Sequence, residues 1–163
     1  MTRLAEQVGA ALKAHGMMLA TAESCTGGGI AQSLTDISGS SAWFERGFVT
    51  YANAAKVEML GVRPSTLDAH GAVSELTVRE MAAGALQHSH ADVALAVSGI
   101  AGPTGGTPEK PVGTVWFGWA VRDGEAHAQL HHLSGDRAAV RDKSVQIALQ
   151  GVLNLLNKRT KTA

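Results

Sequence analysis

The 163-residue chain carries 14 basic and 14 acidic side chains, and it is 45% hydrophobic and 17% charged. This length and composition suit one folded domain, and the balanced charge without a basic block argues against nucleic acid or an acidic membrane as the main partner. The one cysteine excludes an internal disulfide framework and a cysteine-rich metal site.

Helices and strands alternate along the first half of the chain. Helices are indicated by apolar residues three and four positions apart and by N-capping residues, and strands by short apolar or aromatic runs. In chain order the pattern predicts a helix over residues 2–14, a strand over 17–23, a helix over 26–35, a strand over 46–51, and helices over 54–60, 65–69 and 75–88.

The second half begins with a short, mostly apolar run that suits a buried central strand. A long irregular stretch rich in glycine and proline follows, and loops of this length are commonly functional or disordered. An Arg-Asp-Gly-Glu turn then separates two runs of strand composition, which indicates a hairpin. The predicted elements are strands over 92–99, 112–121 and 126–133, a loop over 98–111, a helix from about 134 to 157, and a frayed tail over 158–163.

This order predicts an α/β fold with a mixed sheet, parallel early and antiparallel in the late hairpin, with helices on both faces. No repeat or linker divides the chain, so we expect residues 1–163 to form a single domain. The N-terminus lacks a signal-peptide core and no apolar run approaches the ~18 residues of a spanning helix, so we expect a cytoplasmic protein with no membrane partner. The low charge and the apolar fraction fit a homo-oligomer, most simply a dimer.

Three stretches with chemically active side chains each follow a predicted strand. Because ligands of open α/β sheets bind at the carboxyl ends of the strands, we expect residues 23–28, 51–56 and 98–110 to converge at one edge. The first stretch holds two candidate nucleophiles, Ser24 and Cys25, before a helix start whose N–H groups can stabilise an anion. An ordinary glycine-rich turn has the same pattern, and turn geometry alone does not choose between the two side chains.

Lys56 is a candidate general base. It lies about one turn into a helix that Asn53 is expected to cap, and both a helix N-terminus and partial burial lower the pKa of a lysine. A neutral amine there can take the proton of Ser24, in a serine–lysine arrangement where Tyr51 relays a proton or holds the amine. The alternative is an ordinary solvated surface lysine.

Several common sites are not supported by the sequence. Neither glycine-rich loop matches a P-loop or a dinucleotide fingerprint, although both can offer N–H groups to a phosphate or an oxyanion. No G-x-S-x-G elbow occurs, and the seven histidines lack metal-ligand spacing, so we expect no metal. Lys110 and Arg137 lie near loop ends, where they can meet a phosphate or simply remain solvated.

Dispersed motifs match a known family over most of the chain. The segment TAESCTGG at 21–28 resembles the hallmark of the competence-damage (CinA) C-terminal domain family. Further matching segments are GSSAWFERGFVTY at 39–51, HGAVS at 70–74, SGIAGP at 98–103, KPVGTVWF at 110–117 and SGDR at 134–137. Two positions depart from the family pattern: Ala52, where serine is frequent, and Thr104, where aspartate is common.

The resemblance implies a three-layer α/β/α sandwich that hydrolyses the carboxamide of nicotinamide mononucleotide without a metal or other cofactor. By motif match, Ser24 is the nucleophile, Lys56 the base and Tyr51 a third member of the catalytic set. The expected contacts to this small-molecule nucleotide are Thr26, Gly27, Gly28, Asn53, Ser98, Gly99, Gly102 and Arg137. The rival interpretation is a non-catalytic nucleotide-binding module, in which Lys56 pairs with phosphate and no turnover occurs.

Overall fold

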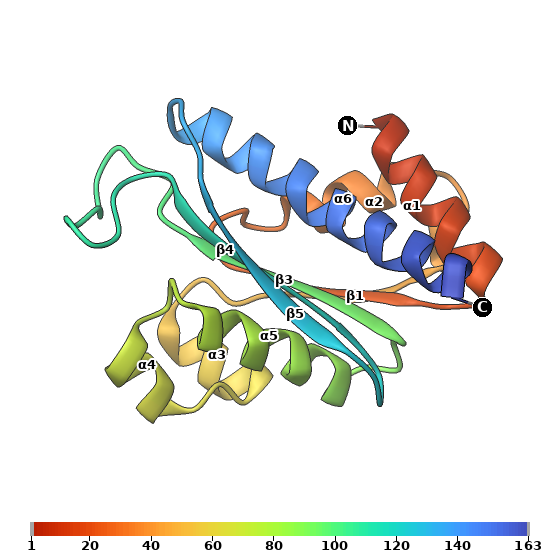
Figure 1. The fold of residues 1–163 in the computed structure, drawn as a ribbon, viewed down its shortest axis with the longest axis horizontal. Coiled ribbons are helices and arrows are strands. Elements are labelled where there is room, and N and C mark those ends of the chain that lie inside the picture. The colour runs from red at the N-terminus through yellow and green to blue at the C-terminus, as the bar shows by residue number, and fades with distance from the viewer. Residues whose placement is uncertain (1, 163) are drawn as a thin grey trace.

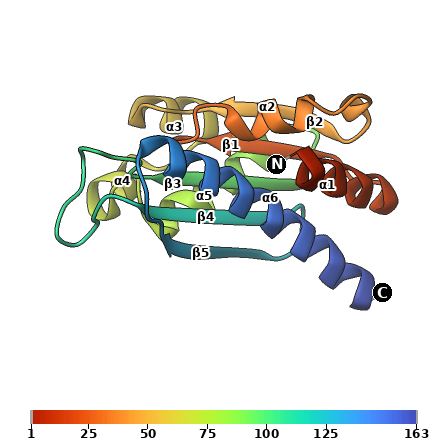
Figure 2. The ribbon, with the colours of Figure 1, turned by 90° about the horizontal axis from the view of Figure 1, so that it is seen from above.

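A five-stranded sheet forms the middle layer of the computed structural model, which describes residues 2–162 (Figure 1). Its strands are β1 (Leu19–Glu23), β2 (Phe44–Val49), β3 (Val93–Gly99), β4 (Thr114–Val121) and β5 (Ala126–His132). They lie in the order β2-β1-β3-β4-β5, as Figure 2 shows from above. Strand β1 runs parallel to β2 and β3, whereas β4 is antiparallel to β3 and β5, which confirms the predicted mixed sheet.

Helices cover both faces of the sheet and complete the predicted three layers (Figure 1). One face carries α1 (Thr2–His15), α2 (Gly29–Thr35) and α6 (Arg137–Thr162). The other carries α3 (Asn53–Leu60), α4 (Pro64–His70) and α5 (Glu75–Gln87), and the short 3-10 helix η1 (Ser40–Ala42) precedes β2. Across residues 2–162, none of the helices has the length and apolar character needed to cross a membrane.

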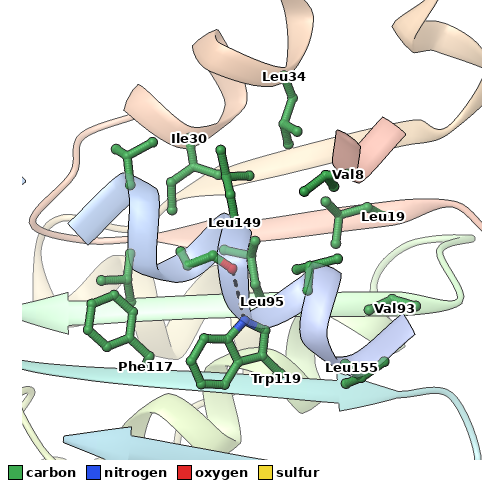
Figure 3. Close-up of a cluster of buried hydrophobic side chains, with 14 of the residues drawn as sticks. Val8, Leu19, Ile30, Leu34, Val93, Leu95, Phe117, Trp119, Leu149 and Leu155 are labelled. Carbon is green, nitrogen blue, oxygen red and sulfur yellow. Dashed lines mark hydrogen bonds between the residues drawn. The ribbon is translucent and has the colours of Figure 1, made fainter. Parts of the chain in front are cut away.

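The larger core lies between the sheet and helices α1, α2 and α6 (Figure 3). Successive side chains of a strand point to opposite faces, so β4 sends Phe117 and Trp119 to this core. The indole Nε1 of Trp119 donates to the Ala148 carbonyl at 3.0 Å, which fixes the ring beneath α6. The opposite core packs under α5, and the strands supply mainly alanine there, including Ala20 and Ala94.

Among the helix boundaries that differ from the prediction, two have clear local reasons. Gly27 (φ 59°) and Gly28 (φ 100°) have left-handed backbone conformations, so α2 begins at Gly29 and residues 26–28 belong to a turn. The predicted end of the last helix near residue 157 is wrong, because no glycine or proline follows to stop it and α6 continues to Thr162. Ala163 lies outside the described residues, and fraying of the tail stays a prediction.

The direction of the strands brings the three predicted stretches to one edge of the sheet. Strands β1, β2 and β3 are parallel, so they end at the same edge, with Glu23, Val49 and Gly99 as their last residues. The loop from β3 back to the antiparallel β4 protrudes at that end of the molecule (Figures 1 and 2). Because β2 ends at Val49, before the predicted residue 51, Tyr51 lies in the connection to α3.

Candidate active site

A cavity of about 330 Å³ lies at this edge and joins the three stretches. Eight predicted site residues line it: Ser24, Tyr51, Asn53, Lys56, Ser98, Gly99, Gly102 and Arg137. The remaining lining residues are Cys25, Ala72, Val73, Ile100, Ala101, Thr104 and Gly105. Residues 72 and 73 belong to the HGAVS segment, whose match to the family was the only signal in the sequence that pointed to them.

Ser24 and Lys56 meet at one side of this cavity. Ser24 follows the last residue of β1, and its N–H donates to the Val97 carbonyl of β3 at 3.0 Å. Lys56 lies one turn into α3, and its Nζ is 3.0 Å from Ser24 Oγ. The lysine is 1% exposed, so it is not the solvated surface residue of the alternative interpretation.

Burial shifts the Lys56 amine towards its neutral form, and its hydrogen-bond partners can accommodate that form. Besides Ser24 Oγ, Nζ contacts the carbonyls of Thr50 at 2.9 Å and Tyr51 at 3.1 Å. A neutral amine has two N–H donors and one lone pair, so these carbonyls can take both N–H groups while the lone pair faces the hydroxyl. Burial lowers the pKa of the Lys56 amine below its usual 10.5, because water no longer solvates the charge.

Residues 24–28 form a tight turn, called here the 24–28 turn. The Glu23 side chain holds this turn and accepts hydrogen bonds from the N–H groups at the start of α2. Its fully buried carboxylate accepts hydrogen bonds from Thr26 Oγ1 at 2.6 Å, Ile30 N at 2.9 Å and Ala31 N at 3.0 Å. The Gly27 N–H donates to the Ser24 carbonyl. The predicted contacts Thr26, Gly27 and Gly28 accordingly do not line the cavity.

Cys25, the other candidate nucleophile, also lines the cavity but is poorly suited to attack. Burial is the main cause that raises the pKa of its thiol to about 11. The nucleophilic form of cysteine is the thiolate, which is scarce at neutral pH when the pKa is that high. The local chemistry therefore favours the Ser24 hydroxyl beside a buried amine.

Tyr51 and Arg137 meet at the outer part of the cavity. The Tyr51 side chain is 62% exposed, and its hydroxyl lies 3.2 Å from Arg137 Nη2. Arg137 Nη1 donates to the Gly102 carbonyl at 2.8 Å, so α6 is joined to the loop after β3. Tyr51 touches Lys56 through its carbonyl oxygen, while its phenol is engaged with Arg137.

Asn53 differs from its predicted capping role. Helix α3 includes Asn53 as its first residue, and the N-cap is Ala52, which makes no side-chain capping bond. A capping serine would supply that bond, so the departure at position 52 leaves the helix start without it. Asn53 lines the cavity instead.

The loop after β3 lines the cavity and contains backbone N–H groups without a partner. Within residues 2–162, the N–H groups of Ala101, Gly102, Thr104 and Gly105 meet no acceptor. Lys110 does not line the cavity, since its Nζ donates to the His70 carbonyl at 2.6 Å. The same part of the chain holds no cluster of three or more His, Cys, Asp or Glu side chains able to bind a metal ion.

The sequence and the fold match known proteins over nearly the whole chain. A family model of the CinA C-terminal domain matches residues 1–156. Nicotinamide-nucleotide amidohydrolase PncC of Escherichia coli (strain K12) is 61% identical over 148 residues, covering 91% of this chain and 90% of that protein. The protein of the same name from Pseudomonas putida is 50% identical over 155 residues, covering 94% of this chain and 96% of that protein.

A solved structure agrees with these sequence relationships. The crystal structure of the competence/damage inducible protein CihA from Agrobacterium tumefaciens matches with a TM-score of 0.91 and 47% sequence identity. The match covers 96% of this chain and 94% of that one. Sequence, fold and matched length agree, and the chain belongs to the CinA C-terminal domain family.

Proposed function

We propose that the protein hydrolyses the carboxamide of nicotinamide mononucleotide to nicotinate mononucleotide and ammonia, a step of pyridine nucleotide recycling. The observation that carries the proposal is the contact of 3.0 Å between Lys56 Nζ and Ser24 Oγ at the side of the cavity. Support for the substrate comes from two relatives of nearly equal length that are named nicotinamide-nucleotide amidohydrolases.

In the first half of the reaction, the neutral amine of Lys56 takes the proton of the Ser24 hydroxyl. Ser24 Oγ then forms a bond to the amide carbon, and the carbonyl oxygen becomes an oxyanion. We assign its stabilisation to the free N–H groups of the cavity-lining residues Ala101, Gly102, Thr104 and Gly105, and one such donor is typically worth ~10²–10³ in rate. The Lys56 ammonium returns its proton to the amide nitrogen, the C–N bond breaks and ammonia leaves.

In the second half, water replaces ammonia beside Lys56. The amine takes a proton from water as the water oxygen bonds to the acyl carbon of the Ser24 ester. The bond between Ser24 Oγ and that carbon breaks, Lys56 returns the proton to the serine, and nicotinate mononucleotide leaves. The amine is the base and the serine the nucleophile, so this route uses no metal-bound water.

The remaining predicted residues fall into two groups in this proposal. Arg137 pairs with the substrate phosphate, while Asn53, Ser98 and the backbone at Gly99 and Gly102 contact the substrate in the cavity. Ser98 is suited to this because it is 1% exposed yet lines the cavity on the strand next to Ser24.

Thr26, Gly27 and Gly28 form the second group, which holds the turn. Thr26 is bonded to Glu23, and the two glycines supply the left-handed backbone that brings the chain from β1 into α2. Tyr51 serves through its carbonyl, which holds the Lys56 amine, and its hydroxyl orients Arg137.

The test is ammonia release from nicotinamide mononucleotide by the wild-type protein and by Ser24→Ala, Lys56→Met and Cys25→Ala. We expect loss of activity in the first two and retention in the third, with no effect of a chelator. Lys13→Met, which removes an exposed lysine of α1, is the matched control for Lys56. Wild-type rates in both Ser24→Ala and Lys56→Met would refute the dyad, and loss of activity with chelator would refute a metal-independent route.

The non-catalytic alternative predicts a different result in the same experiment. A nucleotide-binding module would bind nicotinamide mononucleotide in calorimetry and release no ammonia.

Assembly as a homodimer also stays a prediction, supported by exposed apolar side chains such as Val49 and Leu130 on the two edge strands. Sedimentation of the purified protein distinguishes a dimer from a monomer.

A further inference from the structure

The 24–28 turn is held from the face of the sheet opposite Lys56, by a residue that the motifs did not single out. Arg141 lies in the second turn of α6 and is half-buried. Its Nε donates to the Cys25 carbonyl at 3.1 Å, and its Nη2 donates to the Thr26 carbonyl at 3.3 Å. These contacts join the turn to a helix more than 100 residues away in the sequence.

The other hydrogen bonds of the turn are local. Gly27 N donates to the Ser24 carbonyl at 3.1 Å, and Gly29 N donates to the Thr26 carbonyl at 3.0 Å. The Cys25 carbonyl has no partner besides Arg141 within residues 2–162. Removal of Arg141 therefore leaves this carbonyl without its hydrogen bond, directly after the residue that bears the hydroxyl.

The shape of the guanidinium suits this position. Its planar fork can reach two successive carbonyls at once, which a lysine ammonium cannot do with the same fixed geometry. A Cβ at Gly27 would lie 3.1 Å from Arg141 Nη2, so the missing side chain at this position leaves room for the guanidinium. The turn and Arg141 are thus complementary in both hydrogen bonding and shape.

We propose that Arg141 is a positioning residue for Ser24. By fixing the two carbonyls that follow the serine, it keeps Ser24 Oγ directed at Lys56 Nζ, which approaches from α3 on the other face of the sheet. Misplacement of reacting groups by about 1 Å can cost 10²-fold in rate. The proposal rests on the proposed function for its substrate.

The experiment compares Arg141→Gln and Arg141→Lys with a matched control, Arg122→Gln. Arg122 also donates to backbone carbonyls, those of Ala91 at 2.9 Å and Leu86 at 2.6 Å, but it follows β4 at the opposite edge of the sheet. We measure kcat and KM for nicotinamide mononucleotide, the rate of covalent labelling of Ser24 by a fluorophosphonate, and the melting temperature Tm.

We expect kcat of Arg141→Gln to fall by about 10–100-fold, with KM changed by less than about threefold, because the serine is misdirected while the cavity is retained. Labelling of Ser24 falls in parallel, and Arg141→Lys recovers part of both rates because it keeps one charged donor. Arg122→Gln lowers Tm but keeps kcat at temperatures where it is folded. A purely structural role for Arg141 would lower Tm alone.

Two results overturn the inference. One is a folded Arg141→Gln protein with wild-type kcat and wild-type labelling. The other is a loss of kcat in Arg122→Gln equal to that in the Arg141 variants at matched loss of Tm. If the wild-type protein releases no ammonia but its Ser24 is labelled, the substrate assignment fails and labelling alone decides the role of Arg141. If wild-type Ser24 is not labelled above Ser24→Ala, both proposals fail.

Discussion

The substitution Glu23→Gln tests how the turn that bears Ser24 is held. The carboxylate accepts three hydrogen bonds, two at Oε1 and one at Oε2, from Thr26, Ile30 and Ala31. Glutamine has the same shape but only one accepting oxygen. If that oxygen keeps the two donors at Oε1, the new NH₂ group faces the Ala31 N–H, and two donors confront each other.

The expected loss of stability follows from this count. A buried donor left without its acceptor costs about 1–3 kcal/mol. In a protein of this size, 1 kcal/mol shifts Tm by about 2–4 °C, so we expect Glu23→Gln to melt about 2–12 °C lower. Because the disturbed bond lies at the start of α2, just after the turn, we also expect kcat for ammonia release to fall at temperatures where the variant is folded.

The assay is thermal unfolding at pH 7 followed by circular dichroism, beside the kinetic measurement. Glu75→Gln is the matched control, since Glu75 on α5 is exposed and pairs with Arg79 four residues along. An exposed pair of this kind contributes only about 0.3–0.5 kcal/mol, so the control melts within about 2 °C of wild type. A Glu23→Gln protein that melts within 1 °C of wild type contradicts the account of the turn.

Four further predictions concern the pKa values and the packing. As pH is lowered through the reduced pKa of Lys56, kcat/KM falls because the amine becomes charged; a rate that rises as the pH falls would contradict the base assignment. In the unfolded state the Lys56 amine stays protonated up to about pH 10.5, whereas in the folded state it loses its proton at a lower pH. Between these two pKa values, the free energy of unfolding of wild type relative to Lys56→Met rises with pH by up to about 1.4 kcal/mol per pH unit, which urea titrations measure. The Cys25 thiol, with its pKa raised to about 11, stays protonated, so iodoacetamide labels it slowly at pH 7.5; modification at the rate of a free thiol would disprove this. Gly151→Ala puts a Cβ at 2.1 Å from the Trp119 ring, so calorimetry should show a loss of about 1–3 kcal/mol, and unchanged stability would mean that the ring moves freely.

The sequence predicts the fold well where the signals are local and periodic. Apolar spacing marks the long helices, and the short apolar run of β3 marks the central strand that β1 and β4 flank. The convergence of Ser24, Lys56 and Ser98 follows from a general property of parallel strands, which end at a common edge. These inferences need no knowledge of individual side-chain contacts.

Individual side-chain contacts could not be predicted in this way. Periodicity does not reveal that Glu23 takes the N–H groups at the start of α2, so residues 26–28 were expected to face the substrate. Nor does it reveal that the Tyr51 phenol turns to Arg137, 86 residues away. Arg141 resembles any other cation on an amphipathic helix until the helix is placed over the turn.

Helix α6 also sets the order in which the site can be completed during synthesis. Ser24 and Lys56 are synthesised before α6, whereas Arg137 and Arg141, which hold the loop at Gly102 and the turn after Ser24, belong to that later helix. A nascent chain, or one truncated before α6, therefore contains Ser24 and Lys56 but lacks the two arginines that fix the loop and the turn around them.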